Sequence, residues 1–202
     1  MLRFLAKHKL IYMLPIAFGL YNLAFKDADI FWYMYTFAIL VLMSAATMFS
    51  EIKEELRTWQ SFLYGLLAAV AMYAILLGGY HLVWVLSASA ANSIDGFLSS
   101  YTPESVWHLL LLMFIVVPGE ELFWRGFVQQ QLKQYMPAYA AIGVSAVLFG
   151  LTFWLADFWP GIFAGITVGI ILGYLYEKKK SMPMLIIAHL LLLVLVFIIF
   201  PF

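Results

Sequence analysis

Two acids and a base stand close together in the stretch VVPGEELFWRGF, which covers residues 116–127. Glu121 and Arg125 are four residues apart, so on a helix their side chains lie on one face and can form an ion pair. Glu120 is turned by about 100° from Glu121 around such a helix and has no basic partner nearby in the sequence. A buried carboxylate without a counter-charge is suited to general acid or base catalysis. The spacing therefore predicts that Glu121 and Arg125 position a site in which Glu120 reacts.

His189 is a fourth candidate and lies in the apolar stretch LIIAHLLLLV. Its partner must come from another helix, because it is the only ionisable side chain after Lys180. A neutral imidazole can bind a carboxylate or a metal ion. Structural alternatives stay open for all of these groups: the acids can be bonded to backbone or tryptophan donors, and the histidine can be bonded within a helix bundle.

Several other kinds of site are excluded or unsupported. The chain has no cysteine, so thiol catalysis, disulfides and thiolate metal sites are excluded. No HExxH, GxSxG or phosphate-loop pattern is present, which leaves a zinc protease helix and a serine hydrolase without support. The formal net charge is zero, so nothing indicates nucleic acid as a partner.

The elements that must position these residues are predicted to be membrane helices. Hydrophobic residues make up 65% of the chain and charged residues 11%, where about 25% is usual for soluble domains. Such a chain of 202 residues is expected in a lipid bilayer. Seven apolar segments come near the ~20 residues that a spanning helix needs; they cover residues 10–25, 30–49, 60–88, 106–124, 138–155, 160–176 and 182–200.

The prediction is thus an all-α membrane protein, a bundle of about seven transmembrane helices in a single domain over residues 1–202. The first segment is interpreted as a retained span, since no small-residue cleavage site follows it. The polar stretch 88–104 is expected to connect two spans. With the N-terminus in the cytoplasm, all of the eleven Lys and Arg residues except Lys26 fall on the cytoplasmic side, which favours that orientation.

Two features of the predicted helices concern their packing. Residues 104–135 exceed one span and would form a helix of about 48 Å, in which Pro118 predicts a kink just before the acids. Glycines recur every fourth residue in the sixth segment and predict a face that another helix approaches closely; they are Gly161, Gly165, Gly169 and Gly173.

The motifs, taken together, resemble those of the CPBP family of intramembrane proteases, which includes the CAAX prenyl endopeptidases and the bacteriocin-processing or immunity proteins. PGEELFWRGFVQQQL resembles the family's EExxxR motif, and SAVLFGLTFW (145–154) is similar to its FxxxH motif. FAGITVGIILGYLYEKKKSMPMLIIAHLLLL (163–193) is similar to the next block, which ends in a histidine followed four residues later by Asn or Asp. The three blocks occur in order over about 104–193.

The resemblance implies an intramembrane endopeptidase in which Glu120 activates the attacking water, Glu121 and Arg125 hold the site, and His189 binds and polarises. It implies a peptide or lipidated-protein substrate within the membrane, the lipid bilayer as surroundings, and a bacterial plasma membrane as location. The cofactor stays open between a divalent metal such as zinc, with His189 and Glu120 as ligands, and no metal.

Two positions depart from the family pattern. The histidine of FxxxH is Phe153, and the Asn or Asp after His189 is Leu193. A metal would then have one imidazole and carboxylates, fewer than the three protein ligands of a catalytic zinc. Three hypotheses remain: an active protease with altered helper residues; an inactive binding, regulatory or bacteriocin-immunity protein, including one inactivated by an engineered Phe153; and an unrelated membrane protein, such as a transporter with a buried acid pair.

Overall fold

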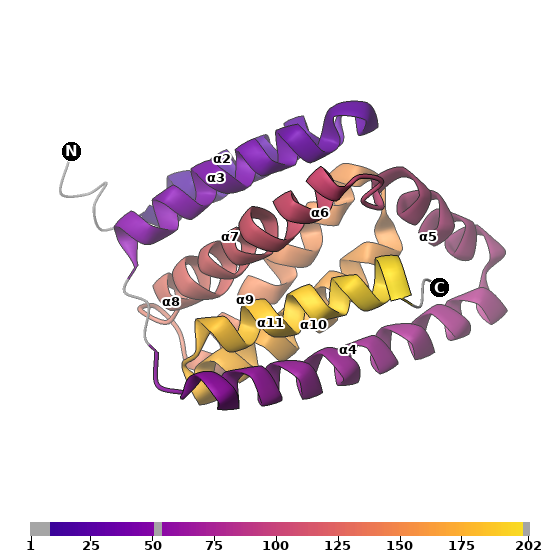
Figure 1. Cartoon of the computed structure of the whole chain (residues 1–202). Coiled ribbons are helices and arrows are strands. Elements are labelled where there is room, and N and C mark those ends of the chain that lie inside the picture. Colours follow the sequence, from indigo (N-terminus) through magenta and orange to yellow (C-terminus); the bar gives the residue numbers. More distant parts are fainter. Residues whose placement is uncertain (1–8, 51–53, 200–202) are drawn as a thin grey trace.

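The computed structural model describes residues 9–50 and 54–199, and every regular element in these ranges is a helix (Figure 1). Six helical runs are long and apolar enough to cross a membrane; they are Ala28–Phe49, Thr58–Leu86, Val106–Leu132, Ala138–Ala156, Trp159–Lys179 and Met182–Ile199. The chain is therefore a multi-pass integral membrane protein, and the predicted all-α class is confirmed.

The first of the seven predicted segments is shorter than the others. It forms α2 (Lys9–Phe25), an apolar helix of 17 residues. A 3-10 turn (Ala28–Ile30) follows, and the Asp27 side chain caps this turn by accepting a hydrogen bond from the N–H of Asp29. The turn leads into α3 (Phe31–Phe49), which runs back along α2. The two helices form a hairpin, called the N-terminal hairpin below.

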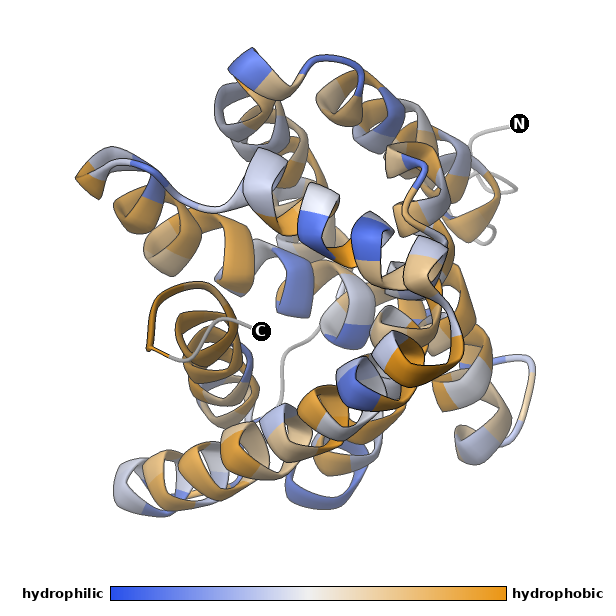
Figure 2. Ribbon diagram, turned by 90° about the vertical axis from the view of Figure 1, so that its right-hand side faces the viewer, coloured by the Kyte–Doolittle hydropathy of each residue, from blue (hydrophilic) through white to orange (hydrophobic). Residues whose placement is uncertain are grey.

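The remaining helices cross the bundle in alternating directions, except α5 (Ala88–Tyr101), which lies at one end of it (Figure 1). In chain order they are α4 (Thr58–Leu86), α5 (Ala88–Tyr101), the run Val106–Leu132 treated below, α9 (Ala138–Leu151), α10 (Trp159–Lys179) and α11 (Met182–Val194). A 3-10 segment (Thr152–Ala156) prolongs α9, and a π-helical segment (Leu195–Ile199) prolongs α11. Hydrophobic residues predominate over most of the bundle (Figure 2).

Residues 88–104 lie between two membrane-spanning runs, as expected, and α5, which the sequence analysis did not predict, occupies most of that stretch. Ser87 caps the helix by accepting a hydrogen bond from the N–H of Ala90. Its apolar residues recur at helical spacing among polar ones, and Phe97 stacks on Phe158 with ring centroids 4.1 Å apart. The polar composition of this stretch does not predict a buried helix, because only one apolar stripe of α5 packs against the bundle.

The glycine face of α10 packs closely against α9, as predicted. A Cβ atom at Gly169 would lie 2.8 Å from Cβ of Ala146, and one at Gly165 would lie 3.0 Å from Cα of Gly150. The same face makes room for aromatic rings further along, since a Cβ at Gly165 would also lie 2.9 Å from Cε2 of Phe153. The glycines therefore determine the spacing of the two helices, and Gly165 leaves the space that the Phe153 ring occupies.

We expect Gly169→Ala to destabilise the protein by about 1–3 kcal/mol, because the added methyl meets the Ala146 backbone, which cannot move aside. Gly143→Ala in α9 is the matched control: a Cβ there meets nothing within 4 Å, so only the helix propensity of alanine is gained. Thermal unfolding in detergent compares the two variants. A melting temperature for Gly169→Ala at or above that of Gly143→Ala would contradict the prediction.

Basic residues occur where α2 and α4 begin and where α10 ends, and these helix ends lie at the same end of the bundle (Figure 1). Contacts tie this end together: Nζ of Lys133 and Nζ of Lys180 lie 2.8 and 2.9 Å from the carboxylate of Glu177. Lys26 lies at the opposite end, just after α2. The orientation with this lysine-rich end in the cytoplasm stays a prediction, and Arg125, which it counted on the cytoplasmic side, is buried inside the bundle. Arg3, Lys7 and Lys53, also counted in that prediction, lie outside the described residues.

Candidate functional site

One continuous helical run, Val106–Leu132, carries both acids and the arginine, close to the predicted limits 104–135. Two of its segments are π-helical rather than α-helical, a feature often found at functional sites. The order is α6 (Val106–Leu111), π segment η2 (Leu112–Val116), α7 (Val117–Glu121), π segment η3 (Leu122–Val128) and α8 (Gln129–Leu132).

Pro118 interrupts the hydrogen-bond ladder of this run, and the interruption takes the form of a π turn. Proline has no N–H, and its ring crowds the carbonyl four residues earlier. The N–H of Val117 accordingly reaches back five residues to the carbonyl of Leu112. In η3 the N–H of Gln129 likewise reaches the carbonyl of Trp124, which also accepts from Oγ of Ser145 at 3.1 Å. The two π turns flank the acids.

Gly119 brings α3 against this helix. A Cβ atom at Gly119 would collide with Cγ2 of Ile39, so only glycine allows the approach. Tyr35 stands one turn before Ile39 on α3 and reaches the neighbouring acid: its hydroxyl donates a hydrogen bond to Oε1 of Glu120. Glu120 is 4% exposed, and this bond joins two groups that are 85 residues apart in the chain.

Glu121 is the centre of a buried ionic cluster. Its Oε1 accepts a hydrogen bond from Nη1 of Arg125 at 3.0 Å, the contact that the spacing predicted. The same oxygen lies 2.7 Å from Nδ1 of His189, which α11 contributes. The guanidinium of Arg125 lies 4.8 Å from the ring centroid of Phe149, a cation–π contact. Oε2 of Glu121 and Nη2 of Arg125 have no hydrogen-bond partner among the described residues.

The two acids lie next to different nitrogens of the His189 ring. Because Oε1 of Glu121 already accepts from Arg125, we assign the proton of the imidazole to Nδ1, which donates to that carboxylate. Nε2 then carries a lone pair and lies 3.9 Å from Oε2 of Glu120, too far for a direct hydrogen bond. The structure thus brings together all four residues that the sequence selected.

Tyr35 is the site residue that the sequence analysis missed. It lies on a helix far from the acids in the chain and outside all three motifs. The available signal was weak: a tyrosine inside an apolar span usually needs a hydrogen-bond partner for its hydroxyl. Other tyrosines fit that description equally well, so the signal could not single out Tyr35.

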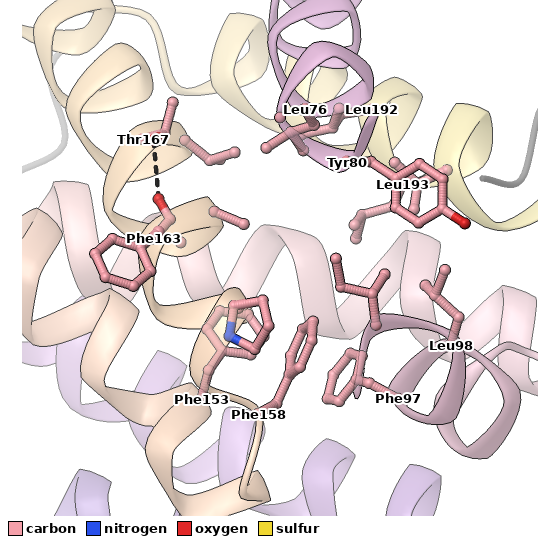
Figure 3. Close-up of a pocket in the computed structure, with 18 of the residues that line it drawn as sticks. Leu76, Tyr80, Phe97, Leu98, Phe153, Phe158, Phe163, Thr167, Leu192 and Leu193 are labelled. Atoms are coloured by element: carbon pink, nitrogen blue, oxygen red, sulfur yellow. Dashed lines mark hydrogen bonds between the residues drawn. The ribbon is translucent and has the colours of Figure 1, made fainter. Parts of the chain in front are cut away.

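A cavity of about 330 Å³ lies beside His189 and is lined almost entirely by apolar side chains (Figure 3). Its walls come from α4, α5, α10, α11 and the end of α9, and Phe97, Phe153 and Phe158 lie together on one side. Leu193 lines it one helical turn after His189. Both residues that depart from the family motifs therefore lie in the cavity wall, where they replace polar groups with apolar ones.

The residues present do not fit a catalytic zinc ion. Such an ion takes three protein ligands, with one position left for water. Here Nδ1 of His189 and Oε1 of Glu121 are bonded to each other, which leaves Nε2 of His189 and Oε2 of Glu120 as facing donors. Within residues 9–50 and 54–199 no set of three His, Cys, Asp or Glu side chains is arranged to hold a metal.

The fold and site define a multi-pass helical membrane protein with a buried acid–imidazole cluster. Residues 101–195 match the family model of the Rce1-like type II CAAX prenyl endopeptidases. The match confirms the resemblance to the CAAX protease family that the motifs indicated, and it gives no support to an unrelated transporter. It contains Glu120, Glu121, Arg125 and His189, whereas Tyr35 lies outside it. Comparison with curated proteins and with solved structures gave no match.

Proposed function

We propose that the chain is an intramembrane endopeptidase that hydrolyses peptide bonds of membrane-associated peptides or lipidated proteins. The observation that carries the proposal is the separation of 3.9 Å between Oε2 of Glu120 and Nε2 of His189 inside the bundle. One water molecule can hydrogen-bond to both atoms in a bent bridge, with roughly 2.8 Å to each. By the family resemblance, the membrane would be a bacterial plasma membrane.

Each residue then has a role in hydrolysis. Glu120 takes a proton from the water molecule while the water oxygen attacks the peptide carbonyl carbon. The C–N bond then breaks, and Glu120 returns the proton to the leaving amine, so the products are a carboxylic acid and an amine. His189 orients the water through Nε2, while Glu121 fixes the ring and its tautomer from Nδ1. Arg125 holds Glu121 in place.

The apolar cavity beside His189 is suited to an apolar part of the substrate. Its walls offer aromatic and aliphatic contacts, and His189, which belongs to the site, also lines it. A substrate embedded in the bilayer would place its apolar part there and its scissile bond next to Glu120.

The test compares new peptide termini in host membranes that contain this chain or its Glu120→Gln variant. We expect termini that are present with the unaltered chain and absent with Glu120→Gln, because an amide cannot take the proton. Glu104→Gln is the control, since Glu104 is an exposed acid just before the same helical run. Thermal unfolding checks that the Glu120→Gln variant is folded. If the folded variant still produces the same termini, the proposal is refuted.

A second candidate is an inactive family member that binds a peptide or partner, for example in bacteriocin immunity. It is favoured by Phe153 and Leu193, which make the cavity beside His189 apolar. In that case no terminus depends on Glu120, and the phenotype survives Glu120→Gln. Filling the cavity by Ala164→Trp would abolish the phenotype, because Ala164 lies in its wall.

A further inference from the structure

We propose that Tyr35 is a positioning residue that holds Oε1 of Glu120, so that Oε2 is the oxygen that activates water beside His189. This inference rests on the proposed function and extends it to a residue outside the family motifs. It places part of the site on the N-terminal hairpin.

The two oxygens of Glu120 have different surroundings. Oε1 accepts the hydrogen bond of the Tyr35 hydroxyl, whereas Oε2 faces Nε2 of His189 at 3.9 Å. A carboxylate that is free to rotate would present either oxygen to the water. The bond to Tyr35 removes that freedom, and catalytic groups gain rate when their geometry is fixed in advance.

Tyr35 can serve as an anchor because its own ring is held on several sides. Its centroid lies 4.9 Å from that of Phe31, 5.7 Å from that of Phe25 and 5.4 Å from that of Tyr21. Tyr35 as a whole residue is 8% exposed. The contact of Gly119 with Ile39, one turn further along α3, sets the distance between Tyr35 and the helix that carries Glu120. A rigid donor is thereby aimed at one oxygen.

A second bond between the N-terminal hairpin and this helix supports the arrangement. Nε1 of Trp124 donates to the hydroxyl of the buried Tyr21 at 3.1 Å. Tyr21 stands on α2 and Tyr35 on α3, so both helices of the hairpin make a polar contact with the helix of the acids. Inside an apolar bundle such contacts fix the register of packed helices.

The test replaces Tyr35 by phenylalanine, which removes only the hydroxyl, and records two properties of the purified full chain in lipid nanodiscs. The first is the infrared carboxyl bands of Glu120, assigned by their loss in Glu120→Gln. The second is kcat and KM for a synthetic peptide that spans the cleavage site found in the comparison of termini. We expect Tyr35→Phe to shift the bands and to lower kcat about 10- to 100-fold with little change in KM.

Tyr33→Phe is the matched control, because Tyr33 is on the same helix and is 58% exposed; it should change neither property. Unshifted Glu120 bands in Tyr35→Phe would overturn the inference, and so would shifted bands with an unchanged kcat. If no cleavage depends on Glu120, the proposed function fails, and the activation of water by Oε2 fails with it. The infrared bands then still decide separately whether Tyr35 holds Glu120.

Discussion

Arg125→Ala is expected to lower the stability of the protein by about 3–5 kcal/mol, much more than Glu120→Ala does. Without the guanidinium, the carboxylate of Glu121 stays in a position with no solvent exposure and keeps only the imidazole of His189 as partner. Removing the Glu120 carboxylate, by contrast, leaves no buried charge without a partner and deprives only the Tyr35 hydroxyl of its acceptor. Breaking one side of a buried ion pair is the more costly change.

Thermal unfolding in detergent measures this difference, with Lys178→Ala as the control for loss of an exposed positive charge. The double variant Glu121→Ala, Arg125→Ala should recover part of the loss, because it removes both charges together. Equal melting temperatures for Arg125→Ala and Glu120→Ala would show that the ion pair does not stabilise the bundle.

The double variant Phe153→His, Leu193→Asn is expected to raise the rate of peptide hydrolysis by about 10²–10³-fold. Both positions line the cavity beside His189, so the new side chains can add hydrogen-bond donors next to the scissile carbonyl. A donor that stabilises the oxyanion is typically worth a factor of that size. The comparison of new termini in host membranes measures the change.

Phe163→His is the control for this double variant, because Phe163 also lines the cavity but is 64% exposed toward the surroundings of the bundle. Adding Glu120→Gln to the double variant should abolish the gained activity. Termini that arise only with the double variant would mean that the unaltered chain is the inactive binding protein. A rate unchanged from that of the unaltered chain would show that Phe153 and Leu193 do not limit catalysis.

The contacts that the sequence predicted are those set by local geometry. Glu121 and Arg125 meet because four residues of helix place them on one face, and the glycine face of α10 follows from the same rule. The apolar segments predicted the membrane-spanning helices, because in a bilayer the backbone must satisfy its hydrogen bonds within the segment. The contact between His189 and the acids depends on the tertiary fold. The order of the motifs predicted only that His189 would join them.

What the sequence could not give depends on contacts between distant segments. The position of α5 was missed because its composition is polar and only one stripe packs. The π turns depend on which carbonyl each N–H can reach, and Pro118 indicated an interruption without its form. Tyr35 meets Glu120 only because α3 packs at Gly119. The residue pattern of either helix alone does not predict this contact.

The docking of the N-terminal hairpin at Gly119 has a consequence for the smallest fragment that can carry the site. A fragment limited to residues 101–195 would keep every family motif but lose Tyr21, Tyr35 and Ile39. The indole of Trp124 and Oε1 of Glu120 would then point toward hydrocarbon without their partners, at a cost of several kcal/mol. The portion of this chain that matches the family model is thus smaller than the portion that surrounds the acids.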